Sequence, residues 1–305
     1  MKVNQKLHSF YLFLAACIWG MAFVAQSKGM EYMDPFTFNG VRCLIGATVL
    51  FLFILARNKV TGRSLRDLDW KVTGIGGLCC GLFLTLASML QQYGIAHTTV
   101  GKAGFITTLY IIFVPIAGIF FRRKVSKVVW IAAVMAAVGM YLLCMTESFS
   151  LSKGDSYVFL CAVFFTGHIM VIDHFSPKTD GVVISCLQFA VSGILCTIAA
   201  FIWGEPAWGA ITSGVSTLLY AGVMSCGVAY TLQIVGQRGV NPTVASLLMS
   251  LESVVATIAG VIAFKIGFLT SDQTMSARQI LGCAIVFAAV LLVQLPEKWF
   301  QKKSA

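Results

Sequence analysis

Long apolar runs, separated by short polar stretches, follow one another along the whole chain of 305 residues. Each run has about the 20 residues that a helix needs to cross the hydrocarbon core of a bilayer. The runs lack the two-residue alternation of β-barrel strands, and a helix satisfies its own backbone in lipid. The pattern predicts ten transmembrane helices, at residues 8–27, 36–56, 72–93, 103–121, 128–145, 156–173, 181–203, 213–235, 243–264 and 279–295.

The composition is typical of an all-α integral membrane protein. Hydrophobic residues make up 58% of the chain and charged residues 11%, whereas soluble proteins carry about 25% charged residues. Only Arg42, Asp173 and Glu252 place a charge inside a predicted span. The net charge of +10 is therefore interpreted as a signature of membrane topology, and no nucleic acid is expected as a partner.

The distribution of Lys and Arg predicts that both termini are cytoplasmic. Cytoplasmic loops are enriched in these residues, and placing the N-terminus inside puts 16 of the 22 on that side and 5 outside. The bias comes mainly from the first half and the C-terminal tail, so the orientation of the second half follows from the even number of spans. No clear cleavage site follows the first span, which we expect to be retained. The expected location is the plasma (inner) membrane.

The cysteines and short motifs indicate no cofactor and no metal. All ten cysteines fall within predicted spans, where thiols behave as small apolar side chains. The chain has no CxxC pair, phosphate-binding loop, metalloprotease helix, nucleophile elbow or EF-hand loop. Without a nucleotide site, transport energy is expected to come from a gradient or from exchange.

Two pairs of segments echo each other. At a shift of 142 residues, GKAGFITTLYIIFVPIAG (101–118) aligns with TVASLLMSLESVVATIAG (243–260), and both carry a stripe of mainly small, hydroxylated or helix-bending residues. At a shift of 146, LAACIWGMAFVAQS (14–27) aligns with LCAVFFTGHIMVID (160–173). Two copies of five spans enter the membrane from opposite sides, which is the inverted repeat common in secondary transporters. We expect repeats at 1–147 and 148–305 that form one transport domain; chance similarity of apolar strings is the alternative.

Three short motifs lie in order along this frame. A Trp-Gly pair (Trp19, Gly20) lies in the first span, Arg42 in the second, and a Leu-Glu pair (Leu251, Glu252) in the ninth. With ten short-looped spans, this arrangement resembles the EamA-type transporters of the drug/metabolite transporter superfamily over nearly the whole chain. The resemblance implies alternating access, with a substrate path between the two halves.

The chain departs from that family's usual pattern in three places. Ser253 follows the glutamate where Pro is usual, and Ile111 follows Tyr110 where Pro is usual, with Pro115 further on. Arg122 and Lys265 lie in regions where a Glu often closes the fourth and ninth helices. These departures affect the transfer of individual residue roles more than the expected fold.

Glu252 is the main candidate for function. It lies about 14 Å along its span, close to the midplane of a core about 30 Å thick. A charge at this depth costs roughly 2.5–3.5 kcal/mol, so we predict a cation or proton site. The alternative is a structural carboxylate, bonded to hydroxyls such as Ser250 or paired with Arg42. Arg42 lies about 9 Å below the outer surface by the same helical rise, and we interpret it chiefly as structural.

Other polar and aromatic residues inside the spans are candidates for the substrate path. Glutamine amides are costly in hydrocarbon unless bonded or hydrated, aromatic faces bind cations, and a histidine can relay protons. Helix packing or helix-to-helix hydrogen bonding is the alternative for each of them. These candidates are Trp19, Gln91, Gln92, Tyr110, His168 and Tyr230.

Together these features favour a secondary active transporter over an enzyme. The expected substrate is a small amphiphilic metabolite, such as an amino acid or an organic cation, and the expected partners are that substrate and the lipid bilayer. Coupling to a proton and exchange remain open, and a monomer or a weak homodimer is expected. The alternatives are a polytopic membrane enzyme using Asp173, His174 and Asp180 at the inner face, and a non-transporting scaffold.

Overall fold

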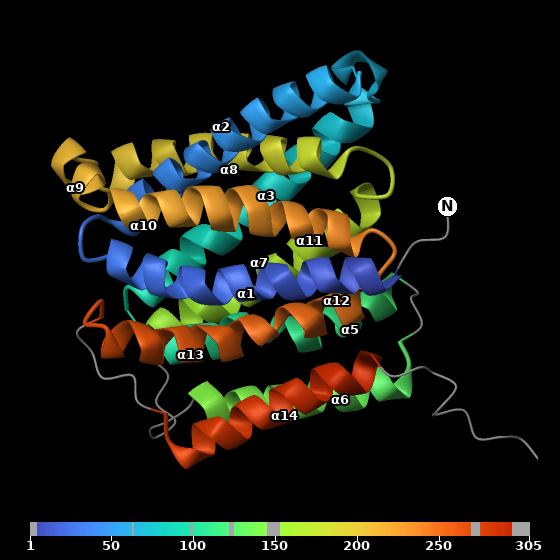
Figure 1. Ribbon diagram of the computed structural model, residues 1–305, viewed down its shortest axis with the longest axis vertical. Coiled ribbons are helices and arrows are strands. Elements are labelled where there is room, and N and C mark those ends of the chain that lie inside the picture. Colours follow the sequence, from blue (N-terminus) through green and yellow to red (C-terminus); the bar gives the residue numbers. More distant parts are fainter. Residues whose placement is uncertain are drawn as a thin grey trace, which may run out of the picture.

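The computed structural model describes residues 5–62, 64–97, 100–121, 125–144, 153–269 and 275–294. These residues form a bundle of helices without a strand (Figure 1). The expected repeat boundary at 147/148 lies outside the described residues. The helices are α1 (Gln5–Gly29), α2 (Pro35–Thr61), α3 (Trp70–Ile95), α4 (Val100–Thr107), α5 (Tyr110–Phe120), α6 (Lys127–Cys144), α7 (Lys153–Phe175), α8 (Gly181–Trp203), α9 (Trp208–Ser213), α10 (Val215–Leu219), η2 (Tyr220–Ala229), α11 (Tyr230–Gln237), α12 (Pro242–Met249), α13 (Leu251–Lys265) and α14 (Ala277–Gln294), with a short 3₁₀ turn η1 (Leu65–Asp67).

The predicted spans correspond to the helices of the structure. Within the described residues, eight helical segments are long and apolar enough to cross a membrane, and the shorter apolar helices Lys127–Leu142 and Ala277–Val293 account for the fifth and tenth spans. The all-α class and ten spans are therefore confirmed. The second span is longer than predicted: α2 continues to Thr61 and ends at Gly62, whose φ of 67° is the left-handed conformation of a helix C-cap.

Helices α2 and α8 are the second helices of the two halves, and they pack directly against each other. A Cβ added to Gly40 would lie 2.8 Å from Thr197 Oγ1, and one on Gly193 would lie 2.7 Å from Leu44 Cδ2. Residues early in α2 thus face residues late in α8, so the two helices are antiparallel. Small residues allow this close approach, and antiparallel mates are what an inverted repeat requires.

The fourth and ninth spans are each interrupted, whereas the sequence pattern predicts continuous helices there. The interruption between α4 and α5 includes Thr108, and the one between α12 and α13 is Ser250, 142 positions further along the chain. Thr108 donates to the Gly104 carbonyl at 2.9 Å, and Ser250 donates to the Leu247 carbonyl at 2.7 Å. Hydroxyls of this kind compete with the helical backbone, and interrupted helices at matching positions of two repeats are typical of transporter binding sites.

The eighth span also differs from a regular helix. Its central segment η2 is π-helical over 10 residues, whereas α3, at the matching place in the first half, is α-helical throughout. The segment packs closely on α2, because Gly222 has the Arg42 carbonyl 3.0 Å from its Cβ position. π-Helical turns occur frequently at functional sites, and this one brings Ser225 and Tyr230 to the centre of the bundle.

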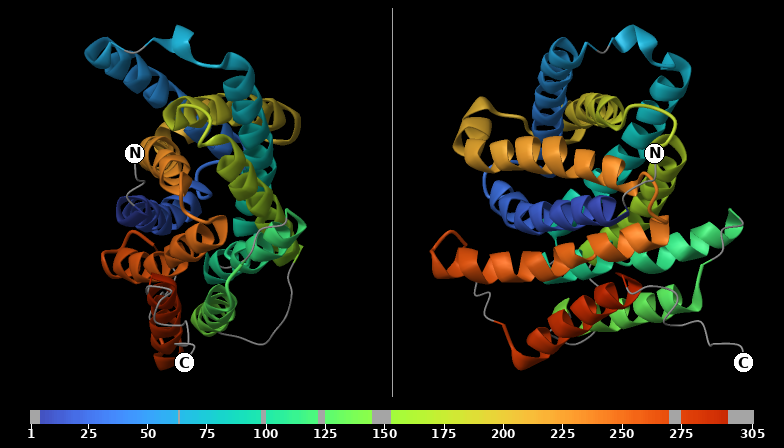
Figure 2. Two further views of the ribbon diagram at one scale, coloured as in Figure 1. Left: turned by 90° about the vertical axis from the view of Figure 1, so that its right-hand side faces the viewer. Right: turned by 45° about the vertical axis from the view of Figure 1, so that its right-hand side comes forward.

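Helices α6 and α14 lie side by side at one edge of the bundle (Figures 1 and 2). They pack at Gly139, whose Cβ position is 2.8 Å from the Val286 backbone nitrogen. Neither helix contributes to the central cavity. The site is therefore built by seven of the other eight spans.

Candidate functional site

A cavity lies at the centre of the bundle, between helices of both halves. It encloses about 490 Å³ of space without protein atoms, including the part that is open to the surroundings. Spans one, three, four, six, eight and nine line it, as expected, and Arg42 adds the second span. The lining residues are Trp19, Phe23, Gln26, Arg42, Gln91, Tyr110, Phe165, Ile169, Ser225, Tyr230, Gln233, Met249 and Glu252.

Glu252 lies in the first turn of α13, directly after the interruption of the ninth span, and is 6% exposed. The Tyr110 hydroxyl, in the first turn of α5, donates to Glu252 Oε1 at 3.0 Å across a separation of 142 residues. Neither structural partner expected for Glu252 is found. Ser250 donates to a backbone carbonyl instead, and the ion pairs among the described residues do not include Arg42.

Arg42 is 4% exposed and also lines the cavity. Its Nε donates to Asn39 Oδ1 at 2.8 Å, and Asn39 in turn donates to the Ser88 carbonyl at 3.0 Å. The guanidinium also lies 5.7 Å from the centre of the Phe38 ring. These contacts orient the side chain, and Arg42 and Glu252 both line the cavity without forming an ion pair with each other.

Aromatic rings and unpartnered polar atoms complete the wall. The Trp19 and Tyr230 rings meet edge to face, with centroids 4.7 Å apart. Trp19 Nε1, Gln26 Oε1 and Gln233 Oε1 are buried without a hydrogen-bond partner among the described residues. Since buried polar groups are nearly always bonded, a donor and two acceptors of the cavity wall are free to bind a polar ligand or water.

Eight of the thirteen residues that line the cavity occupy positions that match between the two repeats. Trp19 matches Phe165 and Phe23 matches Ile169 at the shift of 146; Gln91 matches Gln233 and Tyr110 matches Glu252 at the shift of 142. Seven lining residues were not predicted from the sequence, and two of them, Phe165 and Gln233, match a predicted residue of the other repeat. The seven are Phe23, Gln26, Phe165, Ile169, Ser225, Gln233 and Met249.

Two predicted path residues do not line the cavity. Gln92 is fully buried, and neither its Oε1 nor its Nε2 has a hydrogen-bond partner among the described residues. His168 Nε2 bonds Gln188 Oε1 at 2.9 Å, and its ring lies behind Tyr230, with centroids 6.0 Å apart. Gln91 does line the cavity, and its Nε2 donates to Thr107 Oγ1 at 3.3 Å.

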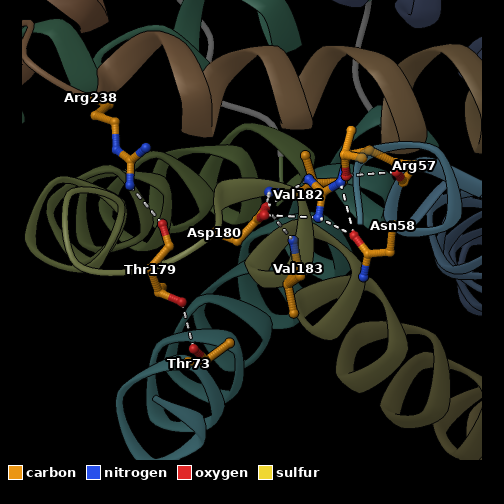
Figure 3. A network of polar contacts seen from close by, with 9 residues as sticks. Arg57, Asn58, Thr73, Thr179, Asp180, Val182, Val183 and Arg238 are labelled. Atoms are coloured by element: carbon orange, nitrogen blue, oxygen red, sulfur yellow. Dashed lines mark hydrogen bonds and ion pairs between the residues drawn. The ribbon is translucent and has the colours of Figure 1, made fainter. Parts of the chain in front are cut away.

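A polar network ties several helices together at one end of the bundle, which we name the Asp180 end (Figure 3). Asp180 caps α8 by accepting from the Val182 backbone at 2.9 Å, and its other oxygen lies 2.8 Å from Arg57 Nη2. We name the ion pair of Arg57 and Asp180 the lock. Arg238 donates to the Thr179 carbonyl at 2.8 Å, which ties α11 to the same loop.

The charge state of the lock is set by its surroundings. Burial raises the pKa of the Asp180 carboxyl, but the hydrogen bond and charge of Arg57 and two backbone N–H donors outweigh it, so the pKa lies below its usual value. Asp180 is therefore ionised at neutral pH and acts as a helix cap and ion-pair partner.

No group of three or more His, Cys, Asp or Glu residues in the described part of the chain is placed to hold a metal ion. The cavity instead offers one cation, one carboxylate, aromatic faces and amide groups. This set can bind a small polar or amphiphilic molecule.

Comparison with known proteins identifies relatives along nearly the whole chain. An uncharacterized transporter of Archaeoglobus fulgidus is 29% identical over 93% of this chain and 84% of its own length. The uncharacterized inner membrane transporter YedA of Escherichia coli is 23% identical over 99% of this chain and 96% of its own length. A solved crystal structure has the same fold, with a TM-score of 0.75 at 18% identity, covering 97% of this chain and 99% of that one.

The sequence model of the EamA-like transporter family matches the chain twice, at residues 7–145 and at residues 152–295. The two matches cover both halves of the bundle, and the relatives are named as transporters and not as enzymes. The chain belongs to the EamA-like transporter family and is a multi-pass membrane transporter of ten helices in two inverted five-helix repeats.

Proposed function

We propose that the protein is a secondary active transporter that moves a small zwitterionic metabolite, with a free amino acid as the first candidate, across the plasma membrane by alternating access. The observation that carries this proposal is that Arg42 and Glu252 line one buried cavity without pairing. A charge inside a membrane protein needs a partner or water. A ligand with a carboxylate for Arg42 and an ammonium group for Glu252 supplies both partners at once.

An organic cation is the second candidate substrate. The edge-to-face rings of Trp19 and Tyr230 support it, because aromatic walls attract cations. Such a ligand pairs with Glu252 but leaves Arg42 without an anion. The zwitterion therefore accounts for more of the cavity.

The membrane orientation supports a direction for the two openings. Both termini are proposed to be cytoplasmic, which makes the Asp180 end the cytoplasmic one, and the lock then closes the cavity on that side. The repeats at 1–147 and 148–305 are proposed to form one transport domain that works as a monomer or a weak homodimer. Their inverted relation gives each opening a counterpart in the other half.

Glu252 is also the proposed coupling group. Glu252, whose hydrogen-bond partner among the described residues is Tyr110, can bind a proton in one part of the cycle and an ammonium group in the other. Competition of this kind links movement of substrate to movement of a proton, or to exchange of one substrate for another.

The membrane-enzyme alternative is not supported at its proposed site. The Asp180 carboxylate is engaged by Arg57 and by the backbone of α8. His174 Nε2 lies 2.6 Å from Lys178 Nζ on the exposed surface. These contacts stabilise a helix end and a loop, and neither Asp180 nor His174 lines the central cavity.

The test is counterflow in proteoliposomes that are preloaded with an unlabelled amino-acid mixture. Radiolabelled L-amino acids and tetraethylammonium are added outside, with protein-free liposomes as the control. The proposal expects accumulation of free amino acids, and expects neither their methyl esters nor their N-acetyl forms to compete. Accumulation of none of the amino acids, or equal competition by the esters, would refute the zwitterion assignment.

A further inference from the structure

A buried polar pair lies beside the cavity, on helices α7 and α8. His168 and Gln188 are both fully buried and bond each other at 2.9 Å. The His168 ring lies 6.0 Å from that of Tyr230 and 6.5 Å from that of Phe165, and both of these rings line the cavity. The pair is thus separated from the cavity by one layer of aromatic side chains.

The pair leaves two of its polar atoms without a partner. His168 Nδ1 and Gln188 Nε2 are buried and make no hydrogen bond with the described residues. The bond between the two side chains uses one donor and one acceptor, whichever way the amide is turned and whichever ring nitrogen carries the proton. One donor and one acceptor therefore remain free in every assignment. Leaving them unmet costs about 1–3 kcal/mol for each group, which favours a ligand or water over a purely structural pair.

The repeat gives this pair a counterpart in the central site. Gln188 lies 146 positions after Arg42, the cation of the cavity. A hydrogen bond also links neighbouring helices near each of these residues: Asn39 of α2 donates to the Ser88 carbonyl of α3 at 3.0 Å. In the second half, Thr231 of α11 donates to Ser185 of α8 at 2.9 Å.

We propose that His168 and Gln188 form a second substrate station beside the central cavity, behind the rings of Tyr230 and Phe165. This inference rests on the proposed function. The station binds the zwitterion when the lock opens: its free donor bonds the substrate carboxylate, and its free acceptor bonds the substrate ammonium group. Hydrogen bonds to uncharged partners are weaker than those to charged ones. The station therefore holds the substrate less tightly than Arg42 and Glu252 do, which allows release at the Asp180 end.

The test uses a reporter that leaves the station intact. Ser185→Cys is introduced into a chain otherwise free of cysteine and treated with the membrane-impermeant reagent MTSET in sealed membrane vesicles of either orientation. Lys178→Cys, an exposed position of the same end, shows from which side that end is reached. A chain that keeps only the native Cys196, fully buried two turns beyond Gln188 on α8, is the buried control.

The expected result has three parts. The thiol introduced by Ser185→Cys reacts only from the side that labels the Lys178→Cys variant, and at least tenfold faster than Cys196. A 10 mM mixture of the twenty L-amino acids slows the Ser185→Cys reaction at least threefold without slowing that of Lys178→Cys. Adding Gln188→Met to the Ser185→Cys chain removes this protection but leaves the reactivity.

Three results would overturn the station: no reaction of the Ser185→Cys variant from the Asp180 end, reaction without protection, or protection that survives Gln188→Met. If Ser185→Cys does not fold, Thr231→Cys reports from the other side of the same hydrogen bond. The labelling requires no net transport, so failure of the counterflow test and failure of this one are separate results.

Discussion

The two halves of the molecule share a backbone plan but differ in side chains where it matters for a ligand. Both interrupt the fourth helix of the repeat at the same place, and the next helix begins with Tyr110 in the first half but carries Glu252 at the matching position of the second. Likewise the second helix carries Arg42 in the first half and Gln188 in the second. In the proposed transport cycle, the symmetric frame accounts for two openings, and the asymmetric side chains orient the substrate in the cavity.

The two ends of the bundle show the same contrast. Asp34 caps α2 as Asp180 caps α8, 146 positions apart, and Asp34 accepts from Phe36 at 2.9 Å and from the Glu205 backbone at 3.3 Å. The position that matches Arg57 is Trp203, whose ring lies 6.1 Å from that of Phe36. In the described part of the chain, only the Asp180 end carries an ion pair across α2 and α8. The two ends therefore differ in the contacts that hold α2 and α8 together.

The largest expected effect comes from replacing Glu252 by an uncharged residue, because the matching position of the first half, Tyr110, is uncharged. Glu252→Gln keeps the shape and removes the charge-assisted bond to the substrate, worth about 1.5–3 kcal/mol, or about 10- to 150-fold. Initial counterflow rates should fall by this factor or lose their pH dependence. Tyr110→Phe, which removes one neutral bond, should cost about tenfold or less. Folded yield in detergent is the control, and normal transport by Glu252→Gln at every pH would show that the carboxylate is structural.

The next effect concerns the contrast between Arg42 and Gln188. Arg42→Gln places in the first half the residue type that Gln188 provides in the second. It removes the cation that is proposed to bind the substrate carboxylate. The apparent KM for free amino acids should rise about tenfold or more, and their methyl esters should still fail to compete. A KM that stays within twofold of wild type, with folded protein, would assign Arg42 to helix packing through Asn39.

The spans and the repeat could be predicted from sequence, because lipid imposes a length and polarity that hydropathy records directly. The interruptions at Thr108 and Ser250 could not, since both lie in apolar runs and the hydroxyl bonds that permit them are visible only in three dimensions. The π-helical η2 likewise leaves no pattern in hydropathy.

Residues of the site could be predicted where a charged side chain interrupts an apolar span. They could not be predicted where the side chain is as apolar as those that face lipid. Glu252 and Arg42 are conspicuous because a charge in a span is costly. Phe165 and Ile169 line the same cavity, yet nothing distinguishes them from lipid-facing residues except their match to Trp19 and Phe23. His168 was overestimated as a cavity residue because depth along a helix does not give the direction of a side chain.

A smaller effect should follow from loosening the Asp180 end. Arg57→Gln removes an ion pair that is partly exposed, and such pairs contribute up to about 1 kcal/mol, or about fivefold in an equilibrium. The Ser185→Cys reporter should then react with MTSET up to about fivefold faster. Arg66→Gln, an exposed arginine in η1, is the matched control and should leave the rate unchanged. An unchanged rate in Arg57→Gln would show that the lock does not govern this opening.

The last prediction concerns the stability that the lock contributes. We expect this contribution not to change with pH near neutrality, whereas the transport rate is expected to depend on pH. Arg57 and the backbone donors hold the pKa of the Asp180 carboxyl below its usual value in spite of burial. A carboxyl with a lowered pKa in the folded state contributes stability above its unfolded value of about 3.9 and loses it as the pH falls through the folded value. The difference in melting temperature between wild type and Arg57→Gln should therefore stay constant from about pH 8 to about pH 5 and shrink only below about pH 4. A difference that changes between pH 8 and pH 6 would mean that another titrating group controls the lock, and the comparison of the two ends would have to include that group.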